Sequence, residues 1–168
     1  MEEIVLKPIG YVHVDVDDET VKNTYEGVPG IIEIKPEYRE GLEGLEGFSH
    51  IIIIAYLHKT RPEHRKVLKV RPRRLRRFGI KIDDIPEVGV FASDSPHRPN
   101  PIALSIVELV EIKDNKIYVR GLDLFDGTPV LDIKPYSRDR CIENIRVPEW
   151  DLVLEERILE KLGEVKYI

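Results

Sequence analysis

The sequence predicts a mainly β protein with a few short helices and one longer helix near its C-terminus. Short β-branched and apolar runs recur along the chain, and residues 51–56 (I-I-I-I-A-Y) are the strongest of them. These runs do not alternate with long helical patterns, as a doubly wound sheet would require. No G-x-G-x-x-G follows a predicted strand, so a Rossmann-type fold is not expected.

The strand signals are local. Residues 51–56 are apolar throughout, which is typical of a strand buried on both faces. A hairpin is expected over residues 105–124, because two alternating runs flank a Lys113-Asp114-Asn115 turn. Asn and Asp tolerate the left-handed backbone that such turns need. The predicted strands cover residues 6–16, 31–34, 51–56, 106–112 and 117–120.

Two helices are predicted. Residues 36–42 form a short one, with Pro36 in its first turn. The clearer one runs over residues 148–162 and is followed by Gly163, a typical C-terminal cap. Its apolar residues recur with helical spacing, so one face should be buried. They are Trp150, Leu154, Ile158 and Leu162.

The composition is that of a globular protein. The chain has 168 residues, of which 42% are hydrophobic and 34% are charged. Its longest strongly apolar run, residues 51–57, is too short to span a bilayer, and the first residues lack a signal-peptide pattern. We therefore expect no membrane association and a cytoplasmic location. Cys141 is the single cysteine, so neither an intrachain disulfide nor a cysteine zinc cluster is expected. Glutamine is absent while charged residues abound, which favours a thermophilic source.

Residues 59–81, here called the basic segment, carry eleven Lys and Arg against one acid, Glu63, in a chain of net charge −5. A basic block on an acidic body is typical of a nucleic-acid binder. The alternative is a solvated face of ion pairs. Pro62 and Pro72 predict a short helix followed by an extended loop, and Phe78 is the only aromatic residue there. The arginines expected to bind RNA are Arg71, Arg73, Arg74, Arg76 and Arg77.

Residues 94–101 (D-S-P-H-R-P-N-P), here called the proline ribbon, hold three prolines in six residues. Each proline fixes its own φ and pushes the preceding residue toward extended geometry, so a stiff, non-helical segment is expected. Apolar runs at residues 88–92 and 102–107 flank it and are expected to be buried strands. A rigid polar loop between buried strands is a usual place for binding groups. The alternative is a proline-rich connector with solvated charges.

Three motifs carry a resemblance to a known family. Residues 95–102 (S-P-H-R-P-N-P-I), 44–50 (G-L-E-G-F-S-H) and 122–136 (L-D-L-F-D-G-T-P-V-L-D-I-K-P-Y) resemble signatures of the TrmO family, also called TsaA-like. The resemblance implies a small β-barrel, usually a homodimer, in one domain over residues 1–168. Its motif-bearing core would cover about residues 4–137, with a C-terminal helical extension at about 148–163.

The same resemblance implies an S-adenosylmethionine-dependent tRNA methyltransferase. Its substrate would be N6-threonylcarbamoyladenosine beside the anticodon, methylated on N6. Two positions depart from the family pattern: Asp94 replaces an arginine, and only Pro29-Gly30 matches a P-R-Q-P-like segment. The residues implied at the cofactor are Pro29, Gly30, His58, Lys59, Asp94, Asn100, Ile106, Leu122, Asp123, Leu124 and Phe125.

Asp126 and Arg98 are the candidate catalytic residues. A base that removes the N6 proton would assist methyl transfer, and Asp123, Asp126 and His58 are the candidates for it. Asp126 has a structural alternative as the first residue of an Asx turn. No metal site is expected, because His50 and His58 at opposite ends of one strand would be roughly 26 Å apart.

Two other functions stay open at this point. The chain could be a non-catalytic module that binds RNA, with or without S-adenosylmethionine. It could also be a methyltransferase for another nucleoside or a small molecule, which the charge reversal at Asp94 suggests.

Overall fold

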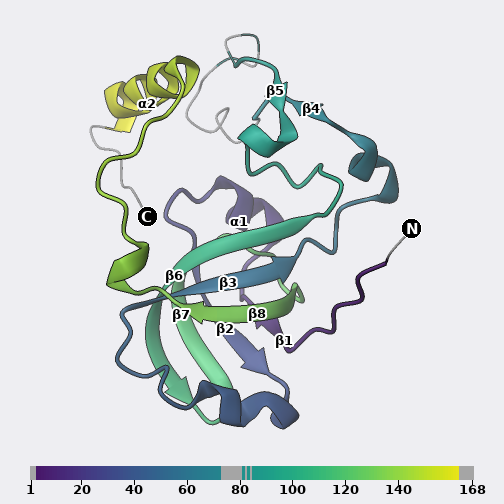
Figure 1. Cartoon of the computed structure of the whole chain (residues 1–168), viewed down its shortest axis with the longest axis vertical. Helices are drawn as coiled ribbons and strands as arrows, with labels where there is room; N and C mark the ends of the chain where they lie inside the picture. Colours follow the sequence, from purple (N-terminus) through teal and green to yellow (C-terminus); the bar gives the residue numbers. More distant parts are fainter. Residues whose placement is uncertain (1–2, 73–80, 82, 84, 163–168) are drawn as a thin grey trace. The chain divides into compact units, whose positions relative to one another are not determined.

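The computed structural model describes residues 3–72, 81, 83 and 85–162. The chain forms two compact units (Figure 1). The barrel unit consists of Met1–Lys59 and Pro101–Arg140, and the insert unit consists of Thr60–Asn100 and Cys141–Ile168. Within the described ranges, no helix has both the length and the apolar character that crossing a membrane requires.

Six antiparallel strands close the barrel in the order β1-β2-β7-β6-β3-β8 (Figure 1). Pairing of Gly10 with Val130 joins β1 to β8 and completes the circle. The predicted mainly β barrel is thus confirmed. The strands are β1 (Gly10–His13), β2 (Val28–Ile34), β3 (His50–Tyr56), β6 (Ile102–Lys113), β7 (Lys116–Leu122) and β8 (Pro129–Pro135).

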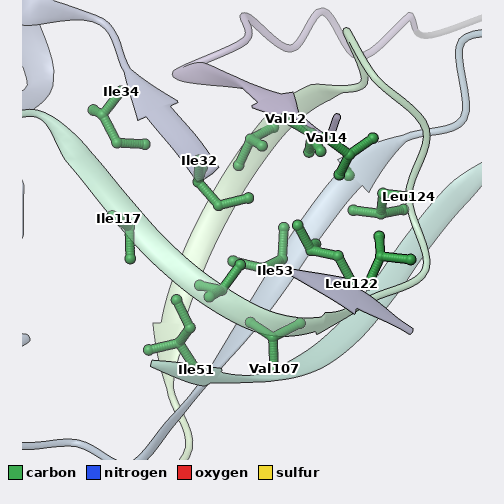
Figure 2. Packing of buried hydrophobic residues seen from close by; sticks show 14 of the residues in the cluster. Val12, Val14, Ile32, Ile34, Ile51, Ile53, Val107, Ile117, Leu122 and Leu124 are labelled. Atoms are coloured by element: carbon green, nitrogen blue, oxygen red, sulfur yellow. The ribbon is translucent and has the colours of Figure 1, made fainter. Parts of the chain in front are cut away.

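The barrel interior is filled by aliphatic side chains, because alternate residues of each strand point inward (Figure 2). The predicted hairpin is β6–β7, and its turn residue Asp114 has φ +54°, the left-handed conformation expected there. The larger side chains buried in this core are Val12, Ile32, Ile34, Ile51, Ile53, Val107, Ile117, Leu122, Leu124 and Val130.

Several strand predictions need correction. The predicted strand over residues 6–16 is only the four residues of β1, whereas β2 is longer than the predicted 31–34. β8 was not predicted at all. The apolar run 88–92 is not a buried strand: it divides into the two-residue β5 (Val88–Gly89) and a 3₁₀ turn, η5 (Val90–Ala92).

The helices agree better with the sequence. η1 (Pro36–Leu42) has the predicted bounds but is a 3₁₀ helix. α2 (Glu149–Leu162) begins one residue later than predicted, and Leu154 and Ile158 on its predicted face are buried. Gly163 lies outside the described residues. A further helix, α1 (Asp18–Asn23), was not predicted; the Asp17 carboxylate caps it by accepting the Thr20 N–H at 2.8 Å.

The insert unit holds the basic segment from Thr60 onward, the proline ribbon up to Asn100, and α2. The predicted short helix of the basic segment is the 3₁₀ turn η2 (Pro62–Lys66), and β4 (Lys69–Val70) pairs with β5. The proline ribbon is non-helical, as predicted. Arg71 is described, and its guanidinium donates to the carbonyl oxygen of Ile85 at 2.5 Å. Arg73, Arg74, Arg76, Arg77 and Phe78 lie outside the described residues.

Candidate functional site

Three of the predicted cofactor residues meet at one end of the barrel unit. His58 and Lys59 follow β3, and Phe125 lies in the loop between β7 and β8. The Lys59 ammonium is 5.0 Å from the centre of the Phe125 ring. It also contacts both carboxylate oxygens of Asp18 at 2.7 Å, and Lys22 of the same helix lies 5.6 Å from that ring. The unpredicted helix α1 therefore forms one side of the site.

His58 has an unusual environment. Its Nδ1 atom is buried and finds no hydrogen-bond partner among the residues that the structure describes. Burial lowers the pKa of His58 from 6.5, and the positive charge of Lys59 lowers it further, while Asp18 and Asp126 act in the opposite direction. His58 is therefore mainly a neutral imidazole at neutral pH, and its Nδ1 is a buried polar atom without a described partner.

Asp126 is held by the end of the first strand. Its Oδ1 accepts the backbone N–H of Val14 at 3.2 Å, and Nδ1 of His13 lies 3.8 Å away. An Asx turn would use the N–H of Thr128, which instead donates to the carbonyl of Phe125 at 3.2 Å. The Asp126 carboxylate thus joins the end of β1 to the loop after β7, and the Asx-turn alternative is wrong.

His13 is a residue of this site that the sequence did not indicate. Its Nε2 lies 3.1 Å from Oε2 of Glu33 on the neighbouring strand, so the imidazole stands between Glu33 and Asp126. In the sequence His13 is one polar residue in an alternating strand, far from Asp126. Only closure of the barrel brings the two together.

Asp123 is fixed from inside the barrel. The hydroxyl of Ser105, a buried residue of β6, donates to Oδ1 of Asp123 at 2.5 Å. The neighbouring side chains of Leu122 and Leu124 point into the hydrophobic core (Figure 2). They can therefore meet a ligand only through their main-chain groups, whereas the exposed carboxylate of Asp123 can do so directly.

Gly30 lies against Leu122 across the β2–β7 pair. The register of this pair shifts between Val28 and Gly30, and a Cβ atom at Gly30 would lie 2.6 Å from Cδ1 of Leu122. It would also lie 2.8 Å from the backbone carbonyl oxygen of His13 on β1, which cannot move aside as a side chain can, so this position requires glycine. Pro29 is exposed beside it, while Ile106 pairs with Ile52 in the middle of β6 and is half-buried.

The remaining predicted residues lie in the insert unit. Asp94 and Asn100 are exposed on the proline ribbon. The guanidinium of Arg98 donates to three main-chain carbonyls of its own unit, those of Val90 at 2.9 Å, Ser95 at 2.8 Å and Ser93. Arg98 thus fixes the fold of the ribbon, and its part in catalysis stays a prediction.

The described histidines are not gathered around a metal position. His50 begins β3 and His58 follows its end, as expected. His64 and His97 stack with ring centroids 3.9 Å apart, a face-to-face contact rather than a convergence of nitrogens on one ion. Across the described ranges, no group of three or more His, Cys, Asp or Glu side chains is arranged to hold a metal.

Similar proteins are named for S-adenosylmethionine binding or for tRNA methylation. A probable S-adenosyl-L-methionine-binding protein of Pyrococcus abyssi is 38% identical over 149 residues, covering 86% of this chain and 74% of that protein. The tRNA (adenine(37)-N6)-methyltransferase of Mus musculus is 45% identical over 104 residues, which are 62% of this chain but 22% of the mouse protein.

Solved structures agree with these relatives. A crystal structure of TrmO matches with a TM-score of 0.65 and 31% identity, and TrmO from Pseudomonas aeruginosa with 0.64 and 28%. The matches cover 87% and 90% of this chain, but 64% and 63% of those chains. This chain therefore spans less than two thirds of their length. Residues 20–140, which include β2 to β8 and the residues His58, Lys59, Phe125 and Asp126, match the model of the tRNA-methyltransferase O N-terminal domain. The chain belongs to the TrmO family.

Proposed function

We propose that the protein is an S-adenosylmethionine-dependent tRNA methyltransferase that methylates N6 of N6-threonylcarbamoyladenosine beside the anticodon. The observation that carries the proposal is the family match over residues 20–140, because this range contains the cluster of His58, Lys59, Phe125 and Asp126. The mouse relative is named as a methyltransferase of adenine N6 in tRNA. We further propose that the protein is a cytoplasmic homodimer and that the basic segment binds the tRNA.

The side chains at the barrel end suit S-adenosylmethionine. The ligand carries an ammonium, ribose hydroxyls and a sulfonium, and the exposed carboxylates of Asp123 and Asp126 complement the cationic and hydroxyl groups. The buried Nδ1 of His58 is a polar atom that a ligand would satisfy. A neutral imidazole there avoids repulsion of the sulfonium. Asp94 and Asn100 are proposed as cofactor residues on the resemblance alone.

S-adenosylmethionine supplies a methyl group activated by the positive sulfur, which leaves as a neutral thioether. The chain has two tasks, which are to align the acceptor nitrogen with that methyl group and to remove the N6 proton. Asp126 is the leading candidate for the base, because Val14 and His13 fix its carboxylate while leaving it exposed. Asp123 and His58 are the alternatives.

Methyl transfer to tRNA tests the proposal. The purified protein is incubated with methyl-labelled S-adenosylmethionine and with tRNA from cells that make, or cannot make, the threonylcarbamoyl group. Labelled nucleoside should appear only with the modified tRNA, and mass spectrometry should place the methyl group on N6. Transfer to both tRNAs would indicate a different acceptor.

The base is identified by variants in the same assay. Asp126→Asn should reduce transfer by about 10²–10⁴-fold, the range for loss of a general base. Asp114→Asn is the matched control, because Asp114 is an exposed aspartate in the β6–β7 turn, where asparagine also tolerates the backbone. A normal rate for Asp126→Asn would mean that Asp123 or His58 is the base. The variants Asp123→Asn and His58→Gln would then distinguish the two.

A second candidate function is a binding module that holds S-adenosylmethionine without transferring its methyl group. The names of the archaeal relatives favour it, because the proteins of Pyrococcus abyssi and Archaeoglobus fulgidus are named for binding alone. Calorimetric binding near one per chain, with no transfer to any tRNA, would support this alternative.

A further inference from the structure

Phe91 presents its side chain to solvent in the insert unit. It is 83% exposed, although it stands in an apolar run that the sequence predicts to be buried. Burying a phenylalanine fully would stabilise a fold, so leaving this ring in water forgoes that stabilisation. A single exposed apolar residue is ordinary by itself. Phe91 differs from such a residue in two ways: its backbone is held by hydrogen bonds, and lysine side chains lie beside it.

The backbone that carries Phe91 is held on both sides. Val90 before it is buried, and its N–H donates to the carbonyl of Leu68 at 3.0 Å. The Val90 carbonyl accepts from the Arg98 guanidinium at 2.9 Å and from the Ser93 hydroxyl at 3.2 Å. The ring is therefore mounted on an ordered turn rather than on a frayed loop, and ordering it on binding costs little entropy.

Positive charge borders this turn. Residues 68 and 90 are hydrogen-bonded neighbours, and Lys69 on β4 pairs with Gly89 on β5. Lys69 is exposed, as is Lys66 at the end of η2, and both belong to the basic segment. The acids Glu87 and Asp94 lie before and after the β5–η5 turn. Phosphates are therefore expected along β4 rather than beyond β5.

We propose that Phe91 is a stacking platform for an unpaired nucleobase of tRNA, with the flanking phosphate on Lys69 and Lys66. An exposed aromatic ring beside backbone-binding cations is the arrangement that binds single-stranded nucleic acid. Lysine is depleted in the cores of protein–protein interfaces, so the local charge favours RNA over a second copy of this chain. The inference rests on the proposed function for its partner, tRNA.

Fluorescence anisotropy of labelled tRNA, measured at several salt concentrations, tests the platform. Phe91→Ala should weaken binding by about 5- to 100-fold, as loss of one base–aromatic stack does, without changing the salt dependence. Phe91→Leu should weaken it similarly, and Phe91→Trp should retain it. Lys69→Ala should reduce the salt slope by about one. Because Phe91 is exposed, the melting temperature of these variants should match that of the wild type.

The neighbouring Leu68 gives the matched control. It is also apolar and 62% exposed, and Leu68→Ala should leave tRNA affinity unchanged. Unchanged affinity for Phe91→Ala, or full affinity for Phe91→Leu, would overturn the platform. If Phe91→Ala instead abolishes self-association in sedimentation while tRNA affinity holds, the ring docks a second copy and the inference is wrong.

The wild-type protein separates this inference from the proposed function. Wild-type binding of tRNA without methyl transfer, together with a weakened Phe91→Ala, would keep the platform and reject the enzyme. Methyl transfer with a fully active, tightly binding Phe91→Ala would keep the enzyme and reject the platform. Absence of any wild-type tRNA binding would reject both.

Discussion

The hydroxyl of Ser105 and the carboxylate of Asp123 are joined by a 2.5 Å hydrogen bond between the barrel interior and the candidate cofactor site. Ser105 is only 6% exposed and faces inward from β6, so its hydroxyl would otherwise be buried among aliphatic side chains. The bond fixes one oxygen of Asp123 at the end of β7 and orients the carboxylate for a ligand.

Ser105→Ala should therefore weaken S-adenosylmethionine binding. The lost hydrogen bond costs about 1.5–3 kcal/mol of folding stability, because its acceptor is charged. Since Asp123 is then no longer held in one orientation, the affinity measured by calorimetry should also fall. Ser49→Ala is the control, because the exposed Ser49 hydroxyl contacts the ring of His50 at the start of β3 and not an aspartate of the site. Equal affinity of both variants would show that Ser105 does not orient Asp123 for the ligand.

His58 should make stability depend on pH. Burial and Lys59 hold its pKa below 6.5 in the folded protein, whereas the unfolded chain takes up the proton near pH 6.5. The stability that neutral His58 contributes to the free energy of unfolding is therefore complete above pH 6.5. It is lost as the pH falls from 6.5 through the pKa of His58 in the folded protein. Urea unfolding of the wild type between about pH 8 and pH 5 should show this loss.

His58→Gln isolates the effect, because it removes the titrating group and leaves the other histidines. The difference in free energy of unfolding between wild type and variant should change with pH only below about pH 6.5. A difference that stays constant across the whole range would contradict the lowered pKa of His58.

Gly30→Ala should destabilise the barrel. Its Cβ would lie 2.6 Å from Cδ1 of Leu122, 2.8 Å from the carbonyl oxygen of His13 and 2.9 Å from Cγ1 of Val14. Overpacking of this kind costs about 1–3 kcal/mol, which should appear as a lower Tm in calorimetry. Gly41→Ala is the matched control, because no described atom lies within 4 Å of the place that its new methyl group would take. A Tm equal to that of the control would mean that β2 shifts away from β1 and β7 at little cost.

Arg98→Lys should loosen the proline ribbon while leaving the barrel intact. One ammonium cannot replace a guanidinium that reaches the carbonyls of Val90, Ser93 and Ser95. Hydrogen exchange should become faster over residues 90–98 and stay unchanged in β3 and β6. If exchange is unaffected but methyl transfer falls, the guanidinium acts on the reaction and not on the ribbon.

The sequence predicted those elements whose signals are local. The β6–β7 hairpin depends on its own alternation and on Asp114, and α2 depends on the helical spacing of Leu154 and Ile158. β8 escaped prediction because residues 129–135 contain two prolines and two charges, and their strand geometry comes from pairing with β3 and β1. Helix α1 is too short to show an apolar period, and its main signal is the Asp17 cap.

The site was predictable only where its residues lie within local sequence motifs. Resemblance identified His58, Lys59 and Phe125, and the structure brings them together. His13 and Asp18 reach the cluster only because the barrel closes and α1 packs beside it. No local pattern marks either residue. Phe91 escaped as well, since an apolar run gives no sign of which residue points to water.

The register of β3 and β6 has a consequence for how such a protein can change. Tyr56 is paired with Ile102, and the N–H of Leu57 donates to the carbonyl of Pro101 at 2.8 Å. The chain thus departs from the barrel and rejoins it at a single point, so the stretch between can be lengthened, shortened or replaced at small entropic cost. Evolution can in this way exchange the residues between Leu57 and Pro101 without disturbing the pairing of β3 with β6.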